Sequence, residues 1–252
     1  MEIKKTRLAK KIAASGVASR REAEKLIEAG RVLVNGESVK TPVFFVTDQD
    51  KILIDGKNIS SISEEIIIWK FYKPPGVITT KHDPQNRKTV FDFFPNIDGR
   101  LLYVGRLDYN SEGLLLFTNN GNLARKLELP STGLKRTYLA RFRGNFPETG
   151  IRDLKNGIVL NGTRYRPIDI KLQMARTSVV NSWATVTLFE GKNREIRKVM
   201  EHFGCQVSRL VRVGYGPFKL GNLSPGKFSR VSDAEVLKLQ RVIFGDGCFL
   251  KN

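Results

Sequence analysis

The sequence has few of the side chains that hold metal ions or form disulfides. Its 252 residues include two cysteines, Cys205 and Cys248, and two histidines, His82 and His202. With so few of these ligands we expect no zinc site and no other bound metal. Two cysteines so placed do not indicate a disulfide framework, so the cytoplasm, a reducing compartment, is the expected location.

Long apolar runs and acidic residues are also scarce. No apolar run reaches the roughly eighteen residues of a membrane span, and the N-terminus lacks the apolar core of a signal peptide. The chain has 43 Lys and Arg against 25 Asp and Glu, a formal net charge of +18. Such an excess predicts a polyanionic partner or an acidic surface. The 15 phenylalanines predict a packed core rather than a disordered basic tail.

Two short helices are expected near the N-terminus. Thr6 is placed to cap the first helix, which would end at Gly16. Ser19 and Glu22 fit a capping box at the start of the second helix, and Gly30 is placed to end it.

A hairpin and a boundary follow these helices. Asn35 and Gly36 lie between two apolar runs, which is a strong hairpin signal. A polar, serine-rich stretch then has little to bury. We therefore expect a small domain over residues 1–60, a linker over 61–65 and a larger domain over 66–252.

Six basic residues of the first domain fall outside its predicted apolar stripes. They form either an ordinary solvated face or a surface for nucleic-acid phosphates. These residues are Arg7, Lys10, Lys11, Arg20, Arg21 and Lys25.

The middle of the chain holds a lone carboxylate between two apolar runs. The run Leu101–Leu107 ends at Asp108, and Gly113 precedes the second run, Leu114–Phe117. Runs of this length predict buried strands. If the first strand stays extended through Asp108, Arg106 lies on the same face as Asp108. From this pattern alone, Asp108 is either a structural ion-pair partner or a functional carboxylate.

Two further segments carry side chains with two possible roles. A strand over 66–72 is expected to end at Lys73, where two prolines follow. A second strand, Leu134–Phe142, places Tyr138 on its apolar face. Tyr138 is either a core residue or an aromatic platform for a ligand, and Lys73 is either part of a strand terminator or a contact for RNA.

A loop and helix near residue 195 complete the pattern. Ile196 begins an apolar stripe with helical spacing, and Gly204 is placed to end the helix. Arg194, Arg197 and Lys198 lie beside this stripe, either in solvent or facing a site.

Three of these stretches resemble one family of enzymes. Gly105–Asp108 with the following Gly-Leu-Leu-Leu, Lys135–Tyr138, and Gly191–Arg197 are similar to the motifs of pseudouridine synthases of the RsuA/RluB type, which modify ribosomal RNA. Residues 19–36 resemble the S4 RNA-binding module. The resemblance implies an α+β protein, in which an S4 domain of two helices and a hairpin is linked to a mainly antiparallel, mixed-sheet catalytic domain.

The resemblance also implies roles for individual residues. Asp108 takes the place of the catalytic aspartate, and Tyr138 that of the tyrosine that stacks on the target base. Ile196 and Arg197 take the places of residues that support the pocket, with Arg197 our candidate counter-charge for Asp108. Arg106 takes the place of an arginine that helps to displace the target nucleotide.

The expected partner is ribosomal RNA or a precursor of a ribosomal subunit. No cofactor is implied, and we expect a monomer. The residues expected to contact RNA are the six basic residues of the S4 domain together with Lys73, Lys192 and Arg194.

The choice of RNA is less closely defined by the sequence. A loop-rich basic segment, Lys81–Asp92, resembles the branch of the family that acts on the large subunit. The alternatives are the same reaction on small-subunit or transfer RNA, and a non-catalytic S4-type protein of ribosome assembly. The presence of all three motifs together favours the enzyme.

Overall fold

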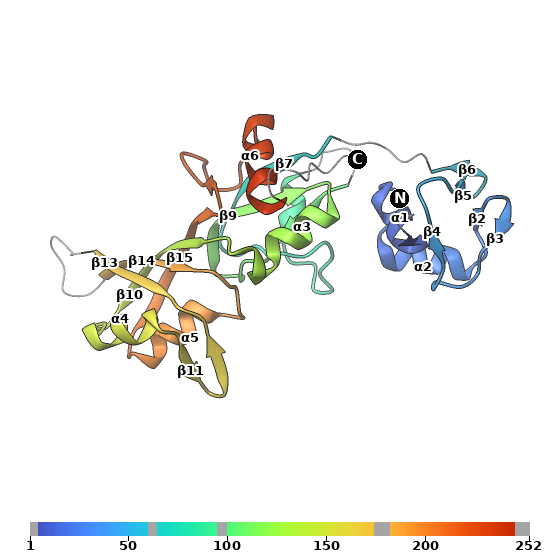
Figure 1. Ribbon diagram of the computed structural model, residues 1–252. Coiled ribbons are helices and arrows are strands. Elements are labelled where there is room, and N and C mark those ends of the chain that lie inside the picture. Colours follow the sequence, from blue (N-terminus) through green and yellow to red (C-terminus); the bar gives the residue numbers. More distant parts are fainter. Residues whose placement is uncertain (1–4, 60–64, 95–99, 174–181, 245–252) are drawn as a thin grey trace. The chain divides into compact units, whose positions relative to one another are not determined.

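The computed structural model describes residues 5–59, 65–94, 100–173 and 182–244 (Figure 1). The chain divides into two compact units between Glu65 and Ile66. Apart from Glu65, the expected linker lies outside the described residues, as does Cys248. Within the described ranges, no helix is both long and apolar enough to cross a membrane.

The first unit is a small α+β domain. Its helices are α1 (Leu8–Ala14) and α2 (Arg20–Glu28), and its strands are β1 (Thr6–Arg7), β2 (Val32–Val34), β3 (Glu37–Ser38), β4 (Phe45–Val46), β5 (Ile52–Ile54) and β6 (Lys57–Asn58). Strands β1 and β4 pair with each other, and the other four form a sheet in the order β3-β2-β5-β6. The buried faces of both helices pack with β2 and β5 in one core.

Local sequence signals explain most of this unit. The capping box is confirmed: the amide of Glu22 donates to Ser19 Oγ and the amide of Ser19 donates to the Glu22 carboxylate. The hairpin is confirmed as well, with Asn35 (φ 53°) and Gly36 (φ 92°) in its turn. The capping role of Thr6 was wrong. Thr6 lies in β1 opposite Val46, because pairing with a strand distant in sequence draws this residue out of the helix.

The second unit is built on one large sheet. Its strands are β7 (Ile68–Lys73), β8 (Leu102–Val104), β9 (Ser111–Thr118), β10 (Arg136–Arg143), β11 (Ile158–Leu160), β12 (Thr163–Tyr165), β13 (Asp169–Gln173), β14 (Ser182–Leu188), β15 (Gln206–Tyr215), β16 (Phe218–Lys219) and β17 (Phe228–Arg230). Its helices are α3 (Gly121–Glu128), α4 (Glu148–Lys155), α5 (Glu195–His202) and α6 (Asp233–Phe244), with short 3₁₀ turns at Val90–Phe93 and Pro130–Thr132.

The sheet runs in the order β13-β14-β10-β15-β9-β7-β17, with β16 on β15 and β8 on β9. Every pairing between its strands is antiparallel except that of β9 with β15. The expected mixed, mainly antiparallel sheet is therefore confirmed. The hairpin of β11 and β12 stands outside this sheet.

Both faces of the sheet are covered. Along β9, Leu115 and Phe117 enter one core and Leu114 and Leu116 enter the other, because successive side chains of a strand point to opposite faces. Helices α4 and α5 bury residues in the first core, and α3 and α6 bury residues in the second (Figure 1).

The first apolar run of the central stretch is shorter than expected as a strand. Strand β8 ends at Val104, and Gly105 follows with φ 65°. This left-handed residue turns the chain out of the sheet, so Arg106 and Asp108 lie in a loop rather than on one face of a strand. The prediction that a strand aligns these two side chains was therefore wrong.

The parallel pairing of β9 with β15 is very close at Gly113. A Cβ atom on Gly113 would lie 2.4 Å from the carbonyl oxygen of Arg212, and the φ of Gly113 is 101°. Such a contact does not occur between real atoms, so only glycine fits this position. Gly113 thus sets the spacing of the two strands that join the halves of the sheet.

We predict that Gly113→Ala destabilises the second unit by roughly 3 kcal/mol or more, because backbone strain and a backbone clash add. The matched control is Gly162→Ala, at φ 73° with no atom within 4 Å of the new methyl group. This change should cost only the free energy of holding alanine in the left-handed conformation, about 1 kcal/mol. Urea denaturation of the full chain measures both losses, and equal losses would contradict the steric argument.

Candidate active site

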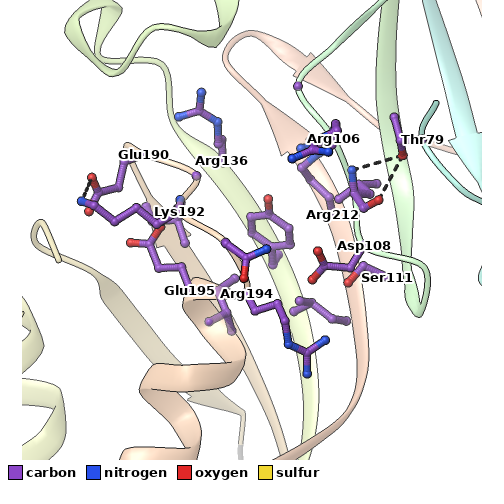
Figure 2. A pocket seen from close by; sticks show the side chains of 18 of the residues that line it. Thr79, Arg106, Asp108, Ser111, Arg136, Glu190, Lys192, Arg194, Glu195 and Arg212 are labelled. Atoms are coloured by element: carbon purple, nitrogen blue, oxygen red, sulfur yellow. Dashed lines mark hydrogen bonds and ion pairs between the residues drawn. The ribbon is translucent and has the colours of Figure 1, made fainter. Parts of the chain in front are cut away.

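An open cavity of about 810 Å³ lies in the second unit, where the two halves of its sheet meet. One wall is formed by residues 105–109, which belong to the segment Gly105–Asn110, here called the Asp108 loop. The opposite wall is the segment 190–196. The floor is formed by side chains of β10 and β15. Figure 2 shows Asp108 and Ser111 on one side of the cavity and Glu190, Lys192 and Glu195 on the other.

Neighbouring segments hold the backbone of the Asp108 loop. The hydroxyl of Thr79 donates to the carbonyl of Leu107 at 3.0 Å and accepts from the amide of Leu107 at 3.4 Å (Figure 2). The amide of Gly76 donates to the carbonyl of Tyr109 at 2.9 Å. The amide of Gly105 donates to the carboxylate of Glu128 at 2.9 Å. The loop is therefore fixed along its length, and Asp108 stands on a rigid support.

Lys73 holds the far end of this loop from inside the protein. It is fully buried, and its Nζ donates to the carbonyls of Pro74 (3.1 Å), Tyr109 (3.4 Å) and Ser111 (2.8 Å). A direct contact with RNA is thus closed to Lys73, and that expectation was wrong. The sequence pattern missed the inward direction because lysine is rarely buried.

The buried amine of Lys73 is easily deprotonated. Burial lowers the pKa of Lys73 to about 8, and the charges of Asp108 and Glu112 oppose this shift. Glu112 itself is held as an anion by Arg209, whose guanidinium donates to both carboxylate oxygens. Those hydrogen bonds lower the pKa of Glu112.

Arg197 supports the Asp108 loop from the opposite side. Its Nη1 donates to the carbonyl of Val207 at 2.9 Å and its Nη2 to the carbonyl of Asn110 at 3.4 Å. Among the described residues it forms no ion pair with Asp108. Burial and the charge of Arg194 lower the pKa of Arg197, while the nearby charge of Asp108 raises it. Arg197 therefore acts on Asp108 at longer range than a contact pair, and its direct contacts position the loop.

The cavity brings together the other residues singled out in the sequence. Tyr138 and Ile196 are buried members of the core, and both also line the cavity, so the two roles of Tyr138 are compatible. Arg106 and Arg194 are exposed at the cavity. Arg194 begins α5 in a left-handed conformation with φ 53°.

Two glutamates, Glu190 and Glu195, lie on the wall opposite Asp108. Glu190 pairs with Lys192, and its Oε1 accepts from the amide of Arg166. Burial, together with the charge of Glu190, raises the pKa of Glu195 to about 7. The Oε2 of Glu195 accepts from the amide of Lys192 at 2.9 Å, and its Oε1 is buried without a partner.

The sequence reasoning missed two arginines of the floor, Arg136 and Arg212, which are 5% and 2% exposed. Both had a signal. Arg136 continues the inward alternation of Tyr138 along β10, and Arg212 interrupts an apolar strand. They were overlooked because arginine is ordinarily a surface residue.

The basic residues of the first unit lie on its two helices and on β1. Arg7, Arg20, Arg21 and Lys25 are exposed. Lys10 is half-buried, as is Lys11, which forms an ion pair with Asp48. Across the described part of the chain, no group of three His, Cys, Asp or Glu side chains could hold a metal ion.

Comparison with known families defines the class of protein. The model of the RNA pseudouridylate synthase family matches residues 67–202, more than half of the chain, and the S4 domain model matches residues 6–52. The chain therefore belongs to the RNA pseudouridylate synthase family and is an RNA pseudouridine synthase, an isomerase. The resemblance to this family and to the S4 module is confirmed.

Individual relatives match along nearly their whole length. An uncharacterized RNA pseudouridine synthase of Rickettsia prowazekii (strain Madrid E) is 44% identical over 237 residues, covering 94% of this chain and 98% of that protein. The ribosomal large subunit pseudouridine synthase B of Bacillus subtilis (strain 168) is 39% identical, covering 93% and 95%. A solved pseudouridylate synthase structure matches with a TM-score of 0.64 and 27% identity, covering 92% of this chain and 99% of that chain.

The buried state of Lys73 gives a pH prediction. Its folded pKa, about 8, lies below the unfolded value of about 10.4. At pH values between these two pKa values, the unfolded chain binds more protons than the folded chain. The contribution of Lys73 to the free energy of unfolding therefore rises with pH, by at most about 3 kcal/mol. Urea denaturation across this window should show this rise in the wild type relative to Lys73→Met. A difference between the two proteins that does not change with pH would assign Lys73 an ordinary pKa.

Proposed function

We propose that this chain converts a uridine of ribosomal RNA to pseudouridine and that Asp108 is its catalytic carboxylate. The observation that carries the proposal is the rigid Asp108 loop at a cavity lined by Tyr138, with the buried Lys73 and the half-buried Arg197 behind it. Both cations place positive charge near the carboxylate of Asp108. An ionised Asp108 can act as a nucleophile or as a base.

The reaction needs a flat site that holds the uracil ring while its bond to the ribose is broken and a new one is formed. The bond from the ribose to N1 breaks, the base rotates, and a bond from the ribose to C5 forms. Removing the uridine from its stack costs a few kcal/mol. Stacking on Tyr138 returns about 1–3 kcal/mol, and Ile196 packs at the same cavity.

Net affinity for RNA comes from the excess of positive charge. Arg106, Lys192 and Arg194 are placed at the cavity to contact the substrate strand. The exposed arginines and lysines of the S4 domain add phosphate contacts, which position RNA without reading its sequence.

The large ribosomal subunit is the proposed source of the substrate. The Bacillus subtilis relative is named for that subunit. The segment Lys81–Asp92 resembles the same branch of the family, and the ion pair of Asp83 with Arg87 gives it a defined shape near Tyr109. Mapping of pseudouridine in ribosomal RNA from cells with and without this protein identifies the uridine.

The first functional prediction concerns the charge of Asp108. Asp108→Asn keeps the shape of the side chain and removes its charge, so conversion of uridine should fall to background while RNA affinity is retained. The control is Asp169→Asn, an exposed position on the edge strand β13, which should leave conversion unchanged. Pseudouridine formation by purified Asp108→Asn protein would overturn the assignment.

The second concerns the S4 domain. Removal of residues 1–60 should leave a folded catalytic unit, because the two units have separate cores. Its affinity for structured ribosomal RNA should fall, and the dependence of affinity on salt should weaken, because phosphate contacts are lost. Filter binding over a series of salt concentrations measures both. An unchanged affinity and salt slope would exclude an RNA-binding role for this domain.

A further inference from the structure

The two buried arginines of the cavity floor have no role in the account above. The side chain of Arg136 donates through Nη2 to the carbonyl of Glu128 (2.9 Å) and to the hydroxyl of Tyr215 (3.0 Å). Arg212 donates through Nε to the carbonyl of Leu114 at 2.7 Å. Both guanidinium groups lie against the same ring, with their central carbons 4.9 and 5.0 Å from the centroid of Tyr215.

Within the described part of the chain, no carboxylate pairs with either positive charge. Neither arginine forms an ion pair with any carboxylate in the described ranges. The Nη1 of Arg136 and the Nη2 of Arg212 are also buried without a hydrogen-bond partner. Burying an unpaired charge is costly, so these two groups favour a ligand with negative charge and acceptor atoms.

Among the described residues Asp108 forms no ion pair with Arg136 or Arg212, and the other acidic side chains of the cavity are engaged elsewhere. Glu128 accepts from the amide of Gly105, and Glu190 pairs with Lys192. Glu195 accepts from the amide of Lys192, and burial favours its neutral form. An incoming ligand is therefore left to compensate the arginines.

Sheet register places both arginines next to Tyr138. Arg212 on β15 is the direct cross-strand partner of Tyr138, and Arg136 lies two residues before Tyr138 on β10. Directly opposed side chains in a sheet are neighbours, as are side chains two residues apart on one face. A base stacked on Tyr138 therefore has its edge beside the two guanidinium groups.

The chemistry of the proposed reaction supplies the matching charge. If Asp108 attacks the sugar carbon or removes a sugar proton, the electron pair of the broken bond passes to N1 of uracil and is shared with O2 and O4. If Asp108 adds to the base at C6, the electron pair of the double bond between C5 and C6 passes through C5 to O4. In each route the ring oxygens become more negative before the new C5 bond forms and the C5 proton leaves.

We propose that Arg136 and Arg212 bind the oxygen edge of the target uracil and stabilise the negative charge that develops on it. This assignment deepens the proposed function and rests on it. Fixed donors in a site closed to water are most effective where charge develops during the reaction. The arginines would thus act on the base from the floor of the cavity, while Asp108 acts from the wall formed by its loop.

The kinetic test uses the mapped target RNA in single-turnover reactions. Arg136→Gln and Arg212→Gln should each lower the rate constant by about 10²–10³-fold, with little change in the dissociation constant for RNA. Arg→Lys at the same positions keeps the charge and should restore part of the rate. Lys171→Gln, an exposed change on β13, is the control and should have no effect.

A substrate with 5-fluorouridine at the target position separates this role from a structural one. Fluorine stabilises negative charge on the ring, and the rate compared is that of cleavage of the bond from ribose to N1, because a fluorine on C5 cannot leave as a proton. The loss of this rate caused by each Gln variant should be smaller for 5-fluorouridine than for uridine. An equal loss on both substrates would overturn the proposal. A loss confined to RNA affinity would instead show that the arginines bind phosphate, and this too would overturn it.

A binding test independent of catalysis uses barbiturate, a uracil-like ring that is anionic at neutral pH. In the Asp108→Asn background, titration calorimetry should show tighter binding of barbiturate than of neutral uracil. Adding Arg136→Gln or Arg212→Gln should remove the preference, and adding Lys171→Gln should not. Equal binding of the two rings in the starting protein would contradict the proposal. Because no RNA is converted here, a failure of the proposed function leaves this result interpretable.

Discussion

The parallel pairing of β9 with β15 is the constraint on which the second unit depends. It joins an antiparallel half made of β13, β14, β10 and β15 to a half made of β9, β7 and β17. Only three register pairs form it, from Ser111 opposite Leu210 to Gly113 opposite Arg212. The ion pair of Glu112 with Arg209 reinforces it. Since the Asp108 loop belongs to one half and the cavity floor largely to the other, this pairing sets the distance between the groups that must act together.

Buried positive charge is the second organising feature, because among the described residues three buried cations form no ion pair with a carboxylate. Lys73, Arg136 and Arg212 are each at least nine-tenths buried. Lys73 is stabilised by three backbone carbonyls, whereas the two arginines keep unpaired donors beside the cavity. Such an arrangement costs folding free energy in the absence of substrate. Under our proposal, a substrate that becomes anionic during the reaction compensates these two charges.

Much of this architecture follows from local sequence. The capping box at Ser19, the Asn35-Gly36 turn and the alternation along β10 are short-range signals, and each was read correctly. The errors at Thr6, Lys73 and the end of β8 have two causes. In two of them a partner far along the chain decided the outcome: Val46 for Thr6, and the carbonyls of Tyr109 and Ser111 for Lys73. At the third, the left-handed Gly105 overrode an apolar run.

The segment from α4 to β13 adds to the outer edge of the sheet, where β13 pairs with β14 alone among the described strands. Its hairpin of β11 and β12 forms no ladder with the main sheet. Changes of length in this segment therefore leave the register at Gly113 untouched, because an edge strand can lengthen, shorten or carry an insertion without moving its inner neighbours. The enzyme thus has a region open to evolutionary remodelling, in which new contacts with an RNA substrate can arise while the geometry of the cavity around Asp108 stays intact.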